Sequence, residues 1–338
     1  MPVMATARTT STGRVLAALV VPLLLLGVML ALESTASARS TGSGCTGTYG
    51  WPVKPFDEAH PIRGGFGDPR TVFRGPRTKN TLLTGGGGFS FHQGLDISAP
   101  DGSPVYAVSS GTVVRARGGR VTVECGNGRT FQYWHIEPAA RVGQHTIAGK
   151  TLLGFIQPKR EHVHLTHLED GRAVNPLAPR RLSPYRDATT PDVLGIATRR
   201  SGARLALVAE AVDMPSMTVP GRWRGFPVTP ARITWRIEDS TGHVVVANRV
   251  ARDVRRGLPR NDRFWGTFAR GVHQNWPVFD GRKERGLTGR YLFRLTRSPF
   301  DTRSLRNGTY VLVVTAEDIV GNAATRTLDL RVANTTGS

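Results

Sequence analysis

The chain has 338 residues and a formal net charge of +20, with 45 Lys and Arg against 25 Asp and Glu. This length accommodates an export segment and two modest domains. Nucleic-acid binding is the usual interpretation of such a charge, but the sequence has no basic helix, no stripe of alternating basic and aromatic residues and no nucleic-acid-binding module. We therefore expect no nucleic-acid partner.

Residues 1–38 are predicted to be a signal peptide. Arg8 and Arg14 precede the apolar run 15–32, and Ala36-Ser37-Ala38 supplies the small residues that a signal peptidase accepts. The alternative is an uncleaved membrane anchor, because the run is nearly long enough to span a bilayer. A proline within the run and the small residues after it favour cleavage. The mature chain is then secreted or attached to the cell wall, with no stable membrane insertion.

Outside the cytoplasm, a basic protein meets anionic wall polymers rather than nucleic acid, and long-range attraction would favour such a partner. The alternative is a compositional habit, since Arg outnumbers Lys 40 to 5. Charge alone therefore assigns no activity, and the sequence leaves the oligomeric state undetermined.

The mature chain is predicted to be all-β. A flexible Ser/Thr/Gly-rich lead-in (39–50) is followed by a first domain (51–178), in which Asn127-Gly128 suits a hairpin turn. Phe131, Tyr133 and His135 alternate and are expected on one face of a strand. Short strands separated by glycine-rich turns indicate antiparallel sheets. The predicted strands of this domain are 105–108, 112–115, 121–125 and 131–135.

A proline-rich linker (179–202) is predicted to lead into a second β-rich domain (203–334). Its spacing of short strands fits an immunoglobulin-like β-sandwich. The predicted strands are 205–209, 233–237, 244–246, 291–295, 310–314 and 327–332. The arginine- and glycine-rich stretch 252–289 is not assigned.

Two motifs in the first domain carry metal-site chemistry. His92 and Asp96 stand four residues apart after a run of glycines, which favours a loop entering a strand over a helix. His162 and His164 stand two apart, so on a strand both side chains point to one face. His92, Asp96 and His164 would give zinc two nitrogens and one oxygen and leave a coordination position open for water.

Further residues complete or compete with this site. His135 and His162 would remain to transfer protons to and from the water. His167 has the opposite parity and is expected at the surface. The cysteines, Cys45 and Cys125, are expected to form a disulfide in an exported protein, worth about 4 kcal/mol on the chain-entropy model. Cys125 as a zinc ligand is the alternative.

The sequence resembles the lysostaphin-type (LytM-like) zinc metalloendopeptidases of bacterial cell walls. The resemblance rests on three motifs in order: His92 to Asp96, Tyr133-Trp134-His135 and His162-Val163-His164. It covers residues 60 to 178, about a third of the chain. It implies an antiparallel β scaffold of the duplicated-hybrid-motif type and one zinc ion per chain.

The resemblance also implies residue roles: zinc binding by His92, Asp96 and His164, catalysis by His135 and His162, and peptidoglycan stems or cross-links as substrate. Two departures affect the expected cleft. The loop 155–161 is shorter and more charged than is usual in the family, and Leu165-Thr166 replaces the usual aromatic-acid pair. The alternative function is a non-catalytic wall-binding or regulatory protein on the same scaffold.

Overall fold

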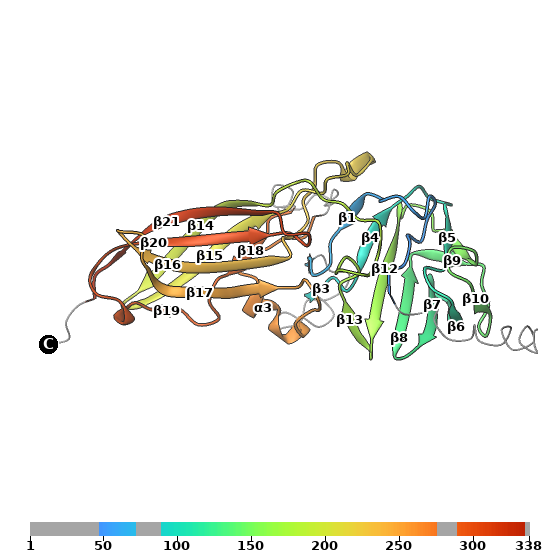
Figure 1. Ribbon diagram of the computed structural model, residues 1–338, viewed down its shortest axis with the longest axis horizontal. Helices are drawn as coiled ribbons and strands as arrows, with labels where there is room; N and C mark the ends of the chain where they lie inside the picture. Colours follow the sequence, from blue (N-terminus) through green and yellow to red (C-terminus); the bar gives the residue numbers. More distant parts are fainter. Residues whose placement is uncertain (1–46, 72–88, 276–288, 335–338) are drawn as a thin grey trace, which may run out of the picture. The chain divides into compact units, whose positions relative to one another are not determined.

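The computed structural model describes residues 47–71, 89–275 and 289–334 (Figure 1). The regular secondary structure of these residues is almost entirely antiparallel strand, and the helices among them are no longer than one turn. The all-β prediction is therefore confirmed. The described residues belong to one compact unit.

The site-bearing half of this unit is built around one long sheet. β4 (Leu95–Ser98) lies between β1 (Ile62–Gly64) and β12 (His162–Glu169). Asp96 of the HxxxD motif on β4 and the HxH pair on β12 therefore lie on neighbouring strands. The order continues from β12 through β8 (Arg129–Trp134), β7 (Arg120–Gly126), β6 (Gly111–Arg117) and β10 (His145–Thr146), and β13 (Arg172–Val174) also pairs with β12. Smaller sheets are formed by β5 (Pro104–Tyr106), β11 (Leu152–Ile156) and β9 (Ile136–Pro138), and by β2 (Pro69–Arg70) with β3 (Ser90–Phe91).

The predicted strands of this half are confirmed, and alternation explains its core. Val121 and Val123 on β7 face Phe131 and Tyr133 on β8, and all four side chains are at most 1 % exposed. Asn127, at the tip of their hairpin, has a φ of 50°, the positive angle that the Asn-Gly turn requires.

The second half contains two four-stranded antiparallel sheets. One contains β14 (Asp192–Ser201), β15 (Arg204–Val212), β18 (Leu292–Arg294) and β19 (Phe300–Asp301). The other runs in the order β17 (Val244–Asp253), β16 (Arg232–Asp239), β20 (Gly308–Glu317) and β21 (Ala323–Val332). Both contribute to one hydrophobic cluster that includes Trp235 and Phe293. The immunoglobulin-like assignment stays a prediction.

The predicted linker contains a strand that was not expected, and the unassigned stretch 252–289 contains short helices. β14 lies within the predicted linker. The unassigned stretch contains η2 (Asn261–Arg263) and α3 (Phe264–Thr267), with Phe264 completely buried. The remaining turns are η1 (Gly221–Trp223) and η4 (Thr302–Ser304).

Buried polar contacts tie the segment around β1 and β2 to the second half. Asp68 is fully buried and accepts hydrogen bonds from the amide (2.9 Å) and hydroxyl (2.7 Å) of Thr229. Arg252, 4 % exposed, donates to the carbonyl of Gly67 and, at 2.9 Å, to the Thr229 hydroxyl. Buried polar groups are tolerated when their hydrogen-bonding capacity is met, as it is here.

Two predictions about the N-terminal region lie outside the described residues. The signal peptide (1–38) and Cys45 belong to the range 1–46, so cleavage and the disulfide stay predictions, and no disulfide forms among the described residues. Tyr49, at the end of the predicted lead-in, is buried against Phe131.

Within the described ranges, no helix is long and apolar enough to cross a membrane.

Candidate metal centre

Strand pairing places the three predicted metal ligands side by side. Asp96 on β4 pairs directly with His164 on β12, so their side chains leave the sheet at the same point. His92 lies in the loop between β3 and β4, as the glycines before it predicted. His162 pairs with Ser98 on the same two strands, two residues from His164, which confirms the parity argument for this histidine pair.

The donor atoms of these ligands converge. His92 Nε2 is 3.1 Å from Asp96 Oδ1 and 2.8 Å from His164 Nδ1, and the last two atoms are 2.9 Å apart. Within the described ranges, these three residues are the one group of His, Cys, Asp and Glu side chains that could hold a metal ion. A tetrahedral zinc ion separates its ligand atoms by roughly 3.4 Å, so the side chains need to move by only a few tenths of an ångström. The donor set therefore fits zinc.

Gly94 allows β4 and β12 to approach this closely. A Cβ atom at this position would lie 2.2 Å from the Leu165 carbonyl oxygen and 2.9 Å from His164 Nε2. Only glycine avoids both clashes, so the Gly in the HxxxD motif is a packing requirement of the site.

Hydrogen bonds behind the ligands set their tautomers. His92 Nδ1 donates to the Gly65 carbonyl (2.8 Å), which leaves Nε2 with its lone pair toward the site. His164 Nε2 is 2.8 Å from the Thr166 hydroxyl, which leaves Nδ1 for the metal. Arg70 donates to Asp96 Oδ2 at 2.8 Å and leaves Oδ1 among the ligand atoms. Such outer partners orient metal ligands and raise metal affinity.

The site also keeps its ligands in the protonation states that a metal needs. Burial lowers the pKa of His92 to about 3, helped by the positive charge of Arg70. Burial alone would raise the pKa of Asp96, but His92 and Arg70 more than offset this and hold it well below its usual value. A neutral imidazole and an ionised carboxylate are the metal-binding forms of these side chains at neutral pH.

The two predicted catalytic histidines lie beside the ligands. The His135 and His162 rings are 4.6 Å apart, and His162 Nε2 is 3.6 Å from Asp96 Oδ1. His162 Nδ1 donates to the Arg160 carbonyl (2.6 Å), so its Nε2 is the unprotonated nitrogen. Burial lowers the pKa of His162 well below its usual value and that of His135 to about 4. Both rings are therefore neutral at neutral pH, and Nε2 of His162 carries a lone pair.

Two expectations from strand parity are wrong. His135 was expected to share the face of Phe131 and Tyr133 on β8, but it lies just beyond the strand with a φ of 65°, and this left-handed turn brings its ring to His162. His167 was expected at the surface, but it is completely buried, 3.1 Å from the Tyr49 hydroxyl. The sheet has a core on this side too, which a single-face pattern does not predict.

The short loop before His162 is well organised. Asp101 accepts hydrogen bonds from the amides of Lys159 (2.5 Å), Arg160 (3.0 Å) and Glu161 (2.7 Å). These backbone donors lower the pKa of Asp101. The loop therefore holds the carbonyl of Arg160 in place, and with it the tautomer of His162.

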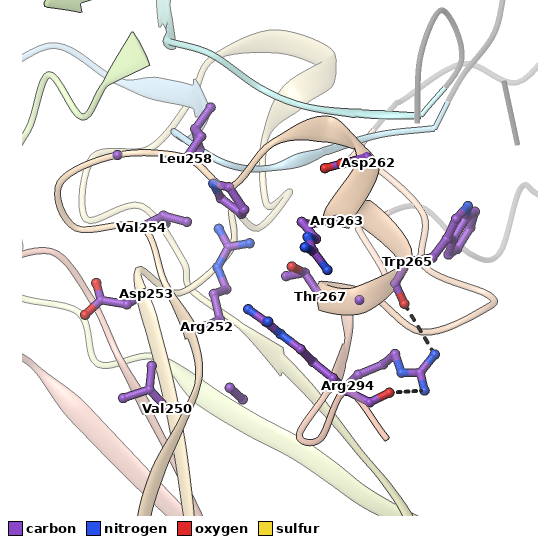
Figure 2. Close-up of a pocket in the computed structure, with 15 residues that line it drawn as sticks. Val250, Arg252, Asp253, Val254, Leu258, Asp262, Arg263, Trp265, Thr267 and Arg294 are labelled. Atoms are coloured by element: carbon purple, nitrogen blue, oxygen red, sulfur yellow. Dashed lines mark hydrogen bonds between the residues drawn. The ribbon is translucent and has the colours of Figure 1, made fainter. Parts of the chain in front are cut away.

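A cavity of about 640 Å³ in the second half contains none of these site residues (Figure 2). It is lined in part by Arg252, Arg263 and Arg294. Arg294 already donates to the carbonyl oxygens of Trp265 and Arg297, and Arg252 is satisfied as described above. The cavity also contains the carboxyl groups of Asp253 and Asp262, but it has no histidine and no group of side chains that could hold a metal ion, so we place the chemistry at the histidines.

Comparison with known proteins identifies the domain that carries this geometry. Residues 90–176 match Peptidase family M23, a range that includes all five site residues. The chain carries an M23 peptidase domain. The motif-based resemblance is thereby confirmed, and the three zinc-ligand candidates lie within the M23 domain. None of the curated proteins compared with the chain matches it.

Solved structures are similar at low identity. The M23 metalloprotease pseudoalterin from the deep sea is 22 % identical, with 39 % of this chain and 81 % of that chain covered and a TM-score of 0.26. The catalytic domain of the prophage-encoded M23 protein EnpA from Enterococcus faecalis is 22 % identical, with coverages of 32 % and 88 % and a TM-score of 0.22. A zinc-containing peptidase from Vibrio cholerae is 21 % identical, with coverages of 35 % and 39 % and a TM-score of 0.24.

Three residues at the M23 site were not predicted from the sequence. Arg63 and Arg70 precede the matched range, and Trp223 follows it. Arg70 Nη2 contacts Asp96, Arg63 Nη2 lies 3.4 Å from His162 Nε2, and the Trp223 ring stacks on Arg63. In a chain with 40 arginines, nothing in the sequence distinguishes these two.

Proposed function

We propose that this chain is an exported, zinc-dependent endopeptidase that hydrolyses peptide bonds in the stems or cross-links of peptidoglycan. The observation that carries the proposal is the convergence of His92, Asp96 and His164 with His135 and His162 beside them. M23 membership supports a metallopeptidase, and the predicted signal peptide and basic charge favour a wall substrate.

The five residues divide the work. His92, Asp96 and His164 would hold zinc, which when bound supplies a Lewis acid and a water molecule of lowered pKa. His162, whose Nε2 is unprotonated, would accept a proton from the attacking water once Nε2 exchanges its long contact with Arg63 for the water. His135, 4.6 Å from it ring to ring, donates to the developing oxyanion or the leaving amine. Because both rings start neutral, the pair can take up and return one proton in each cycle.

A non-catalytic wall-binding or regulatory protein is the second candidate. The observation that favours it is the burial of the site: the side chains of His92 and His162 are 4 % and 5 % exposed. A substrate therefore has a narrow approach. The complete set of ligands and proton-transfer histidines favours the enzyme, since a protein that only binds walls needs no neutral histidine pair.

The test measures zinc content and muropeptide release together. The exported chain is expected to bind one zinc ion and to release peptides from purified walls of at least one cross-link type. His164→Ala should lose zinc and activity, whereas His135→Ala should keep zinc and lose activity. His243→Ala, an exposed histidine away from the site, is the matched control. Stoichiometric zinc without cleavage of any wall type would refute the enzyme, and full activity of His164→Ala would refute the site.

A further inference from the structure

Arg63 places a buried positive charge next to His162, one of the two proposed catalytic histidines. Arg63 is 7 % exposed, and its Nη2 lies 3.4 Å from His162 Nε2. Burial lowers the pKa of Arg63 only to about 10, so the guanidinium is charged at neutral pH. The hydrogen bond is donated by the guanidinium, which again makes His162 Nε2 an acceptor.

The strand geometry turns this side chain toward the site. β1 pairs Ile62 with Ile97 and Gly64 with Asp96, so Arg63 is the extra residue of a β-bulge. A bulge re-aims the side chain of the inserted residue and is frequent beside active sites. Gly64 next to it is equally constrained, because a Cβ there would lie 2.6 Å from Asp96 Oδ2.

Two residues from the second half hold Arg63 in position. The Trp223 ring lies under the guanidinium, 4.1 Å from its central carbon, and Asn275 Nδ2 donates to the Arg63 carbonyl at 2.8 Å. The same amide donates to the Pro227 carbonyl, which fixes the segment that carries Trp223. An arginine stacked in this way has its donors pre-organised at its edge.

The guanidinium nevertheless has unused donors. Nε and Nη1 are buried without a hydrogen-bond partner, and no carboxylate of the described ranges forms an ion pair with Arg63. Asp96 is engaged by Arg70, and Glu161 on the cleft rim is paired with Arg222. A buried cation with unmet donors is costly unless an anion completes it, and a carboxylate is the anion that matches a guanidinium best.

From this arrangement we propose that Arg63 is a specificity-determining residue that binds a carboxylate on the leaving side of the scissile bond. The inference rests on the proposed peptidase function. Arg63 is one histidine ring away from the metal ligands, and one residue of extended chain spans about 3.5 Å. A carboxylate on the residue directly after the scissile bond would then reach Arg63 while the scissile carbonyl lies at the ligands, provided that the side chains covering the buried Nε and Nη1 move aside on binding. The substrate class is a peptide with an α- or side-chain carboxylate at that residue.

The test uses short Ala- and Gly-containing peptides of both configurations, each made in three forms. One form ends in a free α-carboxylate, one in a carboxamide, and one in a carboxamide with Asp as its last residue. Binding is measured calorimetrically with metal-free and zinc-loaded protein, and cleavage with the zinc-loaded protein. We expect at least one carboxylate form to bind roughly tenfold or more tightly than the plain amide, and comparison of the two carboxylate forms shows which source of the anion is used.

Variants assign the preference to Arg63. Arg63→Gln should reduce the acid-to-amide ratio to about one, and Arg63→Lys, which keeps the charge but loses the planar fork, should give an intermediate ratio. Arg260→Gln, whose side chain is 88 % exposed and contacts none of the site residues, should leave the ratio unchanged. Melting temperature and zinc content show that each variant is folded.

Several results would overturn the inference. If the wild-type chain binds the acid and amide forms equally, or binds neither, the inference is refuted without recourse to variants. An unchanged ratio in Arg63→Gln refutes the assignment to this residue. An equal loss of kcat on acid and amide would instead make Arg63 an oxyanion-stabilising group. A carboxylate preference without cleavage of any of these peptides would leave the carboxylate site standing, and the wall-digestion test described above would then decide the peptidase.

Discussion

Single atoms decide how the candidate ligands present their lone pairs. Thr166 has the position of the acidic residue usual in the family, and its hydroxyl lies 2.8 Å from His164 Nε2. The hydroxyl oxygen can accept from Nε2–H, the tautomer that leaves Nδ1 for the metal, and it does so without adding a negative charge beside a ligand. Thr166 can therefore orient the His164 ring as an acceptor in place of the acidic residue.

Thr166→Val is expected to weaken zinc binding about 10- to 100-fold, because the His164 ring loses the partner that orients it. Thr166 is buried, and valine matches its shape, so the fold should persist. Competition with a chelator of known affinity measures the change. Thr166→Ser retains the hydroxyl and should bind zinc nearly as well as the wild type; equal affinities for the Val and Ser variants would show that the hydroxyl has no role.

At the scale of elements, the short loop before His162 is held by tight hydrogen bonding. It comprises residues 157–161, because the first two residues of the predicted loop 155–161 belong to β11. Lys159 and Glu161 have φ values of 66° and 53°, and the three consecutive amides from Lys159 converge on Asp101. Such an anion-binding turn is rigid, which a longer loop rich in small residues would not be. We expect a cleft edge with one shape.

Asp101→Ala is expected to release this loop. Hydrogen exchange of the amides at 159–161 should speed up by several-fold, and peptidase activity should fall with zinc content unchanged, because the Arg160 carbonyl no longer fixes His162. Asp192→Ala, which removes an exposed carboxylate from β14, is the control. Unaltered exchange at 159–161 would mean that the loop holds its shape without Asp101.

The sequence was sufficient for the elements whose pattern is local. Alternating side chains predicted most of the strands, and the period of two placed His162 and His164 in one site, because strand geometry depends only on near neighbours. His135 and His167 depart from this alternation, because His135 has a left-handed backbone and His167 lies in a second buried face of the sheet. Arg63 was not predicted, because a bulge in strand pairing has no local signature.

At the scale of the whole molecule, a buried carboxyl group links stability to pH. Asp213, just after β15, is 6 % exposed, and its Oδ1 has no hydrogen-bond partner. Burial raises its pKa to about 8, and the nearby charges of Asp187 and Asp318 add to this. The folded chain thus holds a proton that the unfolded chain releases near pH 3.8. The stability that this proton confers is complete below that pH and is lost as the pH rises to about 8.

Asp213→Asn should therefore raise the melting temperature at pH 8, where the wild-type carboxyl is partly ionised in a buried site. Near pH 4 the two proteins should melt at similar temperatures, and the difference should grow between these limits. Thermal unfolding followed by circular dichroism at several pH values measures it. Asp192→Asn, exposed on β14, should show no such trend, and a pH-independent difference for Asp213→Asn would contradict the assignment.

The position of Arg63 has a consequence for how this protein diversifies. The M23 match begins at residue 90, so the arginine lies upstream of it, and Asn275, which anchors its carbonyl, comes 212 positions later. Grafting residues 90–176 into another protein would transfer the ligands and proton carriers but not the charge that selects the substrate. Chemistry and selectivity are thus encoded in separate stretches of the gene. Mutations in the second half can change which peptides are accepted while the metal ligands and proton-transfer histidines within residues 90–176 stay unchanged.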